Sequence, residues 1–179
     1  IAPRTVVSSL IGLKVMMKAM APDREWRWLA DICNRLDRNA APAKDKRSRM
    51  LPSGKIYRTA IKRLEILSRS GLNKRVEMVG FRNCLMLALM TACPLRLNNF
   101  TDLEIGRTFL KLSDGWLIRI PAEEVKNCKA ISFDFPERLL PYLEIYLSTI
   151  RSQLTQSREG PLWVAWDGTQ LKRHSVYIA

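Results

Sequence analysis

Residues 81–103 read FRNCLMLALMTACPLRLNNFTDL and decide how the chain folds. The first half of this stretch is almost entirely apolar, which predicts a helix buried within a core rather than one lying on a surface. Pro94 ends that helix, because proline has no amide proton and disfavours a helical residue before it. Leu97, Phe100 and Leu103 follow at spacings that predict a second helical turn anchored in the core.

Arg96 stands directly after this stop, at the junction of the two helices. A cation fixed beside a buried segment is costly unless an anion faces it. The anion can be a nearby carboxylate, such as Asp102 or Glu104, which would give Arg96 a purely structural role. It can also be a ligand. Taken alone, the residues favour the structural role, since most arginines have structural or surface roles.

The charge of the chain indicates the class of its partner. Lys and Arg number 30 against 17 Asp and Glu, so the net charge is +13. The 179 residues, 47% of them hydrophobic, suffice for one globular domain, or for one domain and part of another. Such an excess of positive charge favours a polyanionic partner, with nucleic acid as the first candidate and an acidic membrane surface as the second. The longest apolar run is about half of the ~20 residues that a membrane span requires, so we expect none.

The cysteines and the histidine do not predict a metal site. Cys33, Cys84, Cys93 and Cys128 lack CxxC spacing, and His174 is the only histidine. We therefore expect neither metal nor cofactor, and free thiols in a reducing, cytoplasmic environment. The chain begins at Ile1 and ends within an apparent helix, and we interpret it as a fragment.

Much of the positive charge is concentrated between residues 35 and 63, where ten Lys or Arg residues face two Asp residues. Residues 39–52 contain Ala, Pro and Lys without apolar periodicity, which is typical of a linker. A solvated loop is one interpretation, but a run of like charges repels itself unless a counter-charge such as a phosphate backbone is present. The predicted DNA contacts are Lys44, Lys46, Arg47, Arg49, Lys55, Arg58 and Lys62.

Helical periodicity dominates the first half of the chain. The apolar stripe of a helix over residues 5–20 is predicted to contain Val6, Leu10, Leu13, Met17 and Met20. A second helix presents Trp26, Leu29, Cys33 and Leu36 on one face. Ser53 is placed to cap a third, which runs to Gly71 with Ile56, Ala60, Ile61, Leu64 and Leu67 inward.

After Leu103 the pattern changes from helical to alternating. Residues 109–112, 116–120 and 130–133 are predicted strands of one antiparallel sheet. The loop between the last two carries Lys126 and Lys129 at its tip. Helices are then expected over 136–154 and from Leu171 onward. The fold class is therefore mainly α with a small three-stranded antiparallel sheet, an α+β arrangement.

This ordered pattern resembles the tyrosine recombinases, the phage integrase family. In that family a hydrophobic helix leads into a Thr-Gly-Leu-Arg-like turn and a short helix ending in Leu, and Thr91, Leu95, Arg96 and Leu103 match those positions. The resemblance covers most of residues 53–179, which would be the N-terminal part of the catalytic domain. Residues 1–38 resemble the end of the helical core-binding domain, and 39–52 would be the basic linker between the two.

The resemblance implies a reaction in which a tyrosine cuts one DNA strand, forms a 3′-phosphotyrosyl link and passes that end to a new 5′-hydroxyl. Arg96 would grip phosphate oxygens with its planar fork. A hairpin lysine would protonate the leaving 5′-oxygen. We choose Lys126 over Lys129, although Val125 precedes it where the family commonly has Thr. Asn99 replaces an acidic residue found in many relatives and would support the site by hydrogen bonding.

The later His-x-x-Arg box and the tyrosine nucleophile of the family are not found. His174 begins His-Ser-Val-Tyr and lacks Arg three positions on, so we expect a surface His174 and a Tyr177 that packs in a helix. The resemblance then implies a fragment that binds double-stranded DNA but does not cleave it alone, from a protein that assembles as a tetramer on DNA. The alternatives are a non-catalytic DNA-binding protein with this fold and an unrelated RNA-binding domain.

Overall fold

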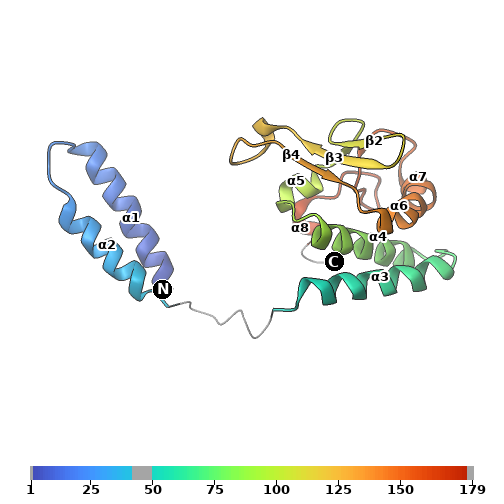
Figure 1. Ribbon diagram of the computed structural model, residues 1–179, viewed down its shortest axis with the longest axis horizontal. Coiled ribbons are helices and arrows are strands. Elements are labelled where there is room, and N and C mark those ends of the chain that lie inside the picture. The colour runs from blue at the N-terminus through green and yellow to red at the C-terminus, as the bar shows by residue number, and fades with distance from the viewer. Residues whose placement is uncertain (1, 42–49, 177–179) are drawn as a thin grey trace. The chain divides into compact units, whose positions relative to one another are not determined.

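The computed structural model describes residues 2–41 and 50–176 (Figure 1). The chain separates into two compact units, Ile1–Met50 and Leu51–Ala179. The architecture mixes α-helices with a β-sheet, and the sheet lies entirely in the second unit. Within the described residues, no helix combines the length and the apolar character needed to cross a membrane.

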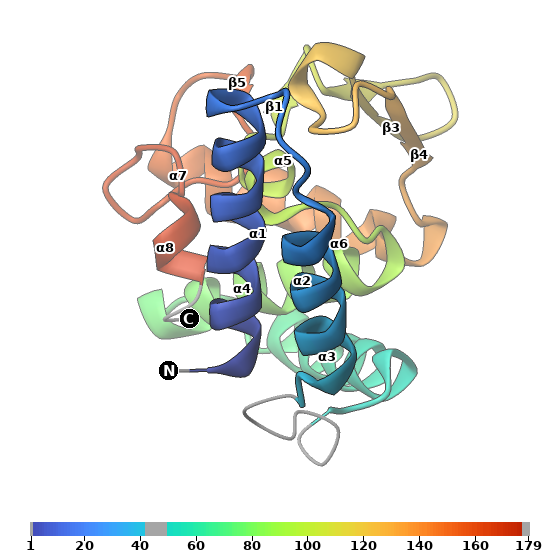
Figure 2. The same cartoon turned by 90° about the vertical axis from the view of Figure 1, so that its left-hand side faces the viewer.

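The first unit is a helical hairpin of α1 (Pro3–Met20) and α2 (Arg27–Asn39), which run side by side (Figure 2). Its small core contains Val7 of α1 with Leu29 and Cys33 of α2. The stripe predicted for α1 is therefore wrong in part. Val6, Leu13 and Met20 of this stripe are exposed. The face of α1 that meets α2 contains Val7 rather than Val6.

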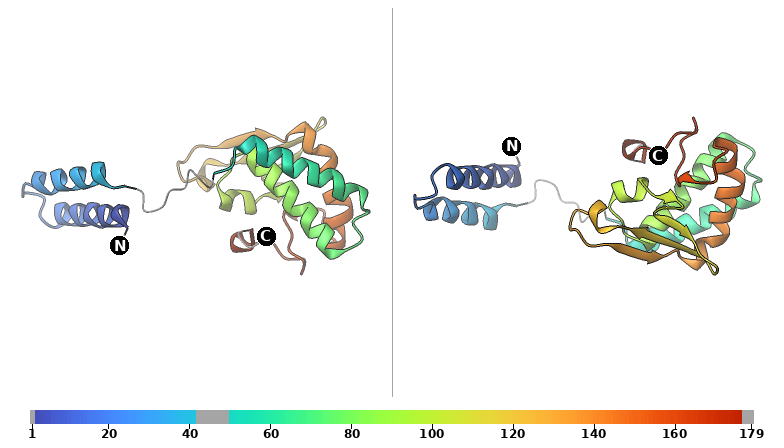
Figure 3. Two further views of the ribbon diagram at one scale, coloured as in Figure 1. Left: turned by 90° about the horizontal axis from the view of Figure 1, so that it is seen from below. Right: turned by 90° about the horizontal axis from the view of Figure 1, so that it is seen from above.

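The second unit begins with the antiparallel pair α3 (Ser53–Arg69) and α4 (Arg75–Ala92), which pack along their length (Figure 3). The predicted inward face of α3 is confirmed at its four buried positions, Ala60, Ile61, Leu64 and Leu67. Ser53 does not cap α3. Pro52 occupies the cap position and no side chain bonds there.

Helix α4 is the buried helix expected from residues 81–103. It ends at Ala92, two residues before Pro94, and Phe81, Leu85 and Leu89 are fully buried along it. The helix is not buried on every side, since Leu87 remains 45% exposed. The predicted second helical turn is α5 (Leu97–Thr101), and the fully buried Phe100 and Leu103 anchor it.

The sheet has five strands rather than the three that were predicted, in the order β4-β3-β2-β1-β5. The expected antiparallel part consists of β2 (Phe109–Lys111), β3 (Trp116–Ile120) and β4 (Ile131–Asp134). The two additional strands are β1 (Glu104–Ile105), parallel to β2, and β5 (Gly160–Pro161), antiparallel to β1. Strands of two residues show no sequence period, so alternation could not reveal them.

The predicted helix over 136–154 is a composite. It contains a 3-10 turn η3 (Glu137–Leu139), helix α6 (Leu140–Ile145), a π-helical segment η4 (Tyr146–Arg151) and α7 (Ser152–Leu154). A short helix α8 (Arg173–Val176) contacts α5.

Aromatic side chains fill the core between the sheet and the helices, which Figure 1 shows on opposite sides of the second unit. Phe109 stacks on Trp116 with ring centroids 4.6 Å apart and meets the edge of Phe135 at 5.6 Å. Phe100 stacks on Trp163 at 5.2 Å. This packing fixes α5 against the segment that follows β5, so the turn carrying Arg96 has a rigid support.

Candidate functional site

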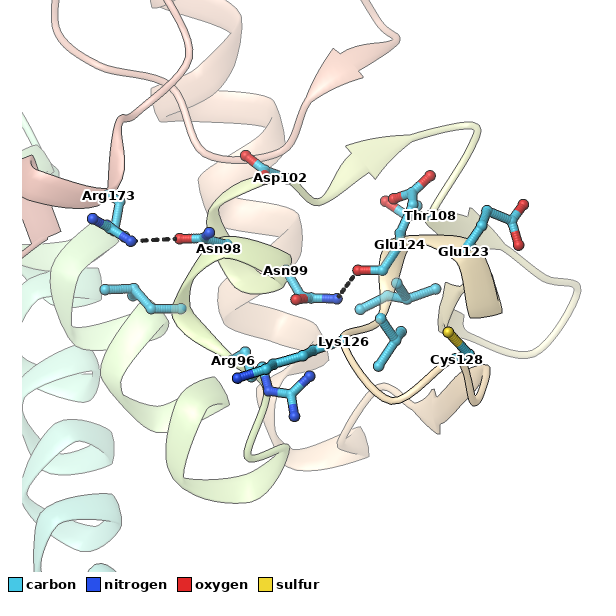
Figure 4. Close-up of a pocket in the computed structure, with 13 residues that line it drawn as sticks. Arg96, Asn98, Asn99, Asp102, Thr108, Glu123, Glu124, Lys126, Cys128 and Arg173 are labelled. Carbon is cyan, nitrogen blue, oxygen red and sulfur yellow. Dashed lines mark hydrogen bonds between the residues drawn. The ribbon is translucent and has the colours of Figure 1, made fainter. Parts of the chain in front are cut away.

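A cavity of about 840 Å³ opens in the second unit where segments far apart in the sequence meet (Figure 4). Its lining comes from the start of α5, from β3, from the loop between β3 and β4, and from α8. Both residues for which catalytic roles were predicted, Arg96 and Lys126, line it, and so does the predicted supporting residue Asn99. The fold therefore brings the three together.

Arg96 owes its position to the backbone on either side of it. Cys93 and Leu95 are buried while Pro94 between them is exposed, so the chain alternates through the turn and directs the next side chain outward. Arg96 is extended (φ −63°, ψ 142°), and its carbonyl accepts the Phe100 amide at 2.9 Å to start α5. Its side chain is exposed to the cavity.

The carboxylates that could have given Arg96 a structural role are engaged elsewhere. Asp102 Oδ1 accepts a hydrogen bond from Gln170 Nε2 at 3.0 Å, and Glu104 Oε2 accepts one from Arg107 Nε at 2.6 Å. Within residues 2–41 and 50–176, Arg96 forms neither a salt bridge nor a side-chain hydrogen bond. Its guanidinium is thus available to a ligand.

Lys126 follows a short 3-10 turn, η2 (Ala122–Glu124), in the loop between β3 and β4. Val125 is 4% exposed and anchors this loop in the core, while Lys126 is exposed and lines the cavity. The apolar residue at position 125 thus has a packing role. Lys129 is also exposed but is not among the lining residues.

Two interactions hold the Lys126 loop in place. Asn99 Nδ2 donates to the Glu124 carbonyl at 3.3 Å and joins α5 to the loop (Figure 4). Arg107 bridges the carboxylates of Glu104 and Glu124. Its hydrogen bond with Glu104, and to a lesser extent that with Glu124, raises the pKa of the Arg107 guanidinium. Lys126 lies two residues beyond Glu124, so its backbone is fixed while its ammonium stays free of protein partners among the described residues.

The charges around the cavity are unevenly distributed. Three basic and three acidic side chains line it, but Asp102 and Glu124 are already bound to other groups. Figure 4 shows Arg96 and Lys126 at one end, with Glu123 at the far side. Two cations that share one end of a cavity repel each other, and an anion bound between them would relieve that repulsion.

The structure adds a cation that the sequence did not reveal. Arg173 of α8 lines the same cavity, and its Nη1 donates to Asn98 Oδ1 at 3.3 Å. No local motif marks Arg173, because its relation to the site depends on a contact between α5 and α8. The neighbouring His174 is exposed, as predicted, and is not among the lining residues; Tyr177 lies outside the described residues.

The predicted DNA contacts fall into two groups. Lys55, Arg58 and Lys62 are exposed on α3, on the side away from its buried face. The other four, Lys44, Lys46, Arg47 and Arg49, lie outside the described residues.

The described residues contain no group of three or more His, Cys, Asp or Glu side chains able to hold a metal ion. None of the described tyrosines lines the cavity, and Tyr146, at 0% exposure, is fully buried.

Comparisons of the chain with protein-family models, with curated proteins and with solved structures each found no match.

Proposed function

We propose that this chain forms the phosphate-binding part of a tyrosine-type site-specific recombinase, which cuts and rejoins DNA through a 3′-phosphotyrosyl intermediate. The observation that supports this most is the convergence of Arg96 and Lys126 on one cavity without protein partners among the described residues. A basic chain with net charge +13 suits a DNA substrate. We also propose that residues 53–179 have the fold of the N-terminal part of a tyrosine recombinase catalytic domain.

The chemistry follows from the two side chains. Negative charge builds up on the phosphoryl oxygens in the transition state, and fixed cationic donors aimed at them are the main means of stabilising it. The guanidinium of Arg96 can donate two parallel hydrogen bonds to two phosphate oxygens. The ammonium of Lys126 can pass a proton to the 5′-oxygen as its bond to phosphorus breaks. Asn99 holds the lysine loop through Glu124 and acts as a positioning residue.

The attacking oxygen must come from elsewhere. The described tyrosines do not line the cavity, so the proposal places the nucleophile outside the described residues. The basic side of α3 would contact the DNA backbone next to the reacting phosphate, with the basic residues of 42–49 adding further contacts.

The test is a covalent-trapping experiment with the complete open reading frame. Duplexes that bind the protein are first selected from a random library and are prepared with a nick near the cleavage site. The protein is then incubated with them. Because of the nick, the short fragment released by cleavage diffuses away, rejoining is prevented and the covalent adduct accumulates. We expect a protein–DNA adduct that survives denaturation, and a fall of about 100-fold or more in its rate of formation for Arg96→Ala. Arg138→Ala, which removes an exposed arginine outside the cavity, is the control.

A non-catalytic DNA-binding protein is the second candidate. The observation that favours it is that no described tyrosine lines the Arg96 cavity. The same experiment separates the two functions, since a non-catalytic protein binds the selected duplexes, with affinity dependent on Arg96, and forms no adduct. Binding unaffected by Arg96→Ala would contradict both.

A further inference from the structure

A second cavity lies on other elements of the second unit and shares no lining residue with the first. It has a volume of about 290 Å³ and lies between the sheet, the end of η4 and the loop after α7. One part of its wall is apolar and consists of Ile105, Trp116 and Leu147.

The rest of the wall is polar and carries two cations. Arg151 and Arg158 line it together with Ser152, Thr155, Gln156 and Ser157. The hydroxyls of Ser152 and Ser157 already donate to backbone carbonyls, whereas the Thr155 hydroxyl donates to no acceptor among the described residues. None of the residues around this cavity, all of which the structure describes, is acidic. A concave site with two arginines and no carboxylate is suited to an anion, since no lining residue carries a negative charge that would pair with the two cations.

Arg151 is the more telling of the two arginines, because it is only 4% exposed. Its Nε donates to the Pro161 carbonyl at 3.1 Å, its Nη1 to Ser157 at 2.6 Å and its Nη2 to Glu159 at 2.9 Å. All three acceptors are neutral backbone carbonyls. Within residues 2–41 and 50–176 no carboxylate pairs with this buried cation.

The bonding of Arg151 is also incomplete. A guanidinium has five N–H donors, and three are used, so one N–H on each Nη has no partner among the described residues. Burial lowers the pKa of the Arg151 guanidinium. Buried charges are ordinarily paired, and this one has carbonyl dipoles on one side and a cavity on another.

We propose that this second cavity binds a small organic phosphate. The phosphate would contact Arg158, the Thr155 hydroxyl and the Arg151 N–H groups that have no partner among the described residues, and an apolar ring would rest against Leu147 and Trp116. The volume of about 290 Å³ lies just below the range of about 300–1,000 Å³ that is usual for ligand sites, so the occupant is one ring with its phosphate rather than a larger cofactor. This inference does not depend on the function proposed for the Arg96 cavity.

The phosphate could belong to a free small molecule or to the end of a nucleic-acid strand. The probes are therefore phenyl phosphate, inorganic phosphate and a short single-stranded oligonucleotide with and without a 5′-phosphate. Each is titrated into the full chain while the indole N–H resonance of Trp116 is followed by NMR. Trp116 is packed against Phe109 on one ring face and lines the cavity, so its signal reports on occupancy.

Arg158→Gln is the main variant, because Arg158 is exposed and its loss leaves the backbone-bound Arg151 in place. Arg138→Gln is the matched control: it removes the same charge from an exposed position outside both cavities. We expect a saturable Trp116 shift with phenyl phosphate, and about tenfold weaker binding in Arg158→Gln, the loss expected for one charge-assisted hydrogen bond. Arg138→Gln should bind like the unmodified chain.

The oligonucleotide probes identify the source of the phosphate. A Trp116 shift that requires the 5′-phosphate and weakens in Arg158→Gln assigns the site to a strand end, whereas a shift with phenyl phosphate alone assigns it to a free small molecule. The proposal is overturned if phenyl phosphate produces no saturable shift, if inorganic phosphate binds equally well, or if Arg138→Gln weakens binding as much as Arg158→Gln.

Discussion

The two arginines of residues 81–103 meet opposite environments. Arg82 lies on α4 and is only 6% exposed; its Nη1 donates to the Val164 carbonyl at 2.8 Å, and its Nε and Nη2 donate to Asn83 Oδ1 at 3.2 and 3.1 Å. Arg96 follows Pro94, is exposed, and has no side-chain partner among the described residues. The first donates three hydrogen bonds to protein acceptors and joins α4 to the segment after β5. The second is left open to a ligand.

This contrast shows that the backbone decides what an arginine does. In the interior of α4 a long cationic side chain must find acceptors within the core, because unpaired buried charge is costly. Beyond Pro94 the helix has ended and the side chain turns into a cavity instead. The same residue type therefore has a structural role before the proline and a ligand-facing position after it.

The largest expected effect is on stability at the buried arginine. Arg82→Met keeps the length of the side chain but leaves the Val164 carbonyl and Asn83 without their donor. We expect a loss of about 3 kcal/mol in the free energy of unfolding, measured by urea denaturation. Arg96→Met should change the same quantity by less than about 0.5 kcal/mol, as is usual for a surface position. Equal losses in the two variants would remove the distinction between the two arginines.

The reverse order is expected for DNA affinity. Arg96→Ala should weaken duplex binding about tenfold at low salt, because one charge-assisted contact to phosphate is lost. The measurement is fluorescence anisotropy with a labelled duplex, repeated at several salt concentrations. Arg138→Ala serves as the control, and an equal loss there would mean that only net charge matters.

The third prediction concerns Tyr146, which lies near Arg82 in the core. Its hydroxyl donates to the Leu162 carbonyl at 2.9 Å and accepts from the Val164 amide at 3.2 Å, so Tyr146→Phe should cost about 1 kcal/mol at neutral pH. Burial raises the pKa of Tyr146 above its ordinary value. The stability that this tyrosine contributes is therefore present below about pH 10 and is lost as the pH rises further, since the unfolded chain ionises first.

The measurement for Tyr146 is urea denaturation of both proteins at neutral pH and above pH 10, with a reductant present. The gap in unfolding free energy between the unmodified chain and Tyr146→Phe should narrow at the higher pH. A gap that stays constant or widens would show that the hydroxyl ionises as readily in the folded protein as in the unfolded chain.

The smallest effect is expected at the residue that supports the lysine loop. Asn99→Ala removes the bond to the Glu124 carbonyl but no charge, so duplex affinity should fall only about threefold. Lys126→Ala should lower the duplex affinity further, since it removes a cation. If Asn99→Ala weakened binding as much as Arg96→Ala, Asn99 would contact the ligand itself rather than position its neighbour.

Much of the fold could be predicted because its main elements have strong local signals. The helix ending before Pro94, the inward face of α3 and the alternation of Trp116, Ile118 and Ile120 are all visible as periodic patterns. The face of α1 that meets α2 was predicted one position away, because several apolar residues compete there. An extended segment was predicted over 160–166, but the pairing of β1 with β5 in the sheet was missed, because two-residue strands are defined by their pairing and show no period.

The site could be predicted only where a motif is local. Arg96 follows a recognisable helix end and Lys126 lies in a recognisable hairpin loop, and the family resemblance, not these local features alone, led to their predicted roles. Arg173 reaches the cavity only through the contact of α8 with α5. Arg151, and Arg82 through its Nη1, donate to backbone carbonyls, which any sequence could supply. Such partners leave no trace in residue types, so the buried arginines could not be distinguished from the exposed Arg96.

The most direct test is to follow the arginine Nε–Hε resonances of the full chain by NMR while a short duplex is added, using Arg96→Lys and Arg82→Lys to assign the two key signals. The open position of Arg96 predicts a large, saturable shift that reverses when salt is raised, while the signal of Arg82 stays in place. If the Arg96 signal did not respond while other exposed arginines did, the cavity beyond Pro94 would not be where this protein grips phosphate.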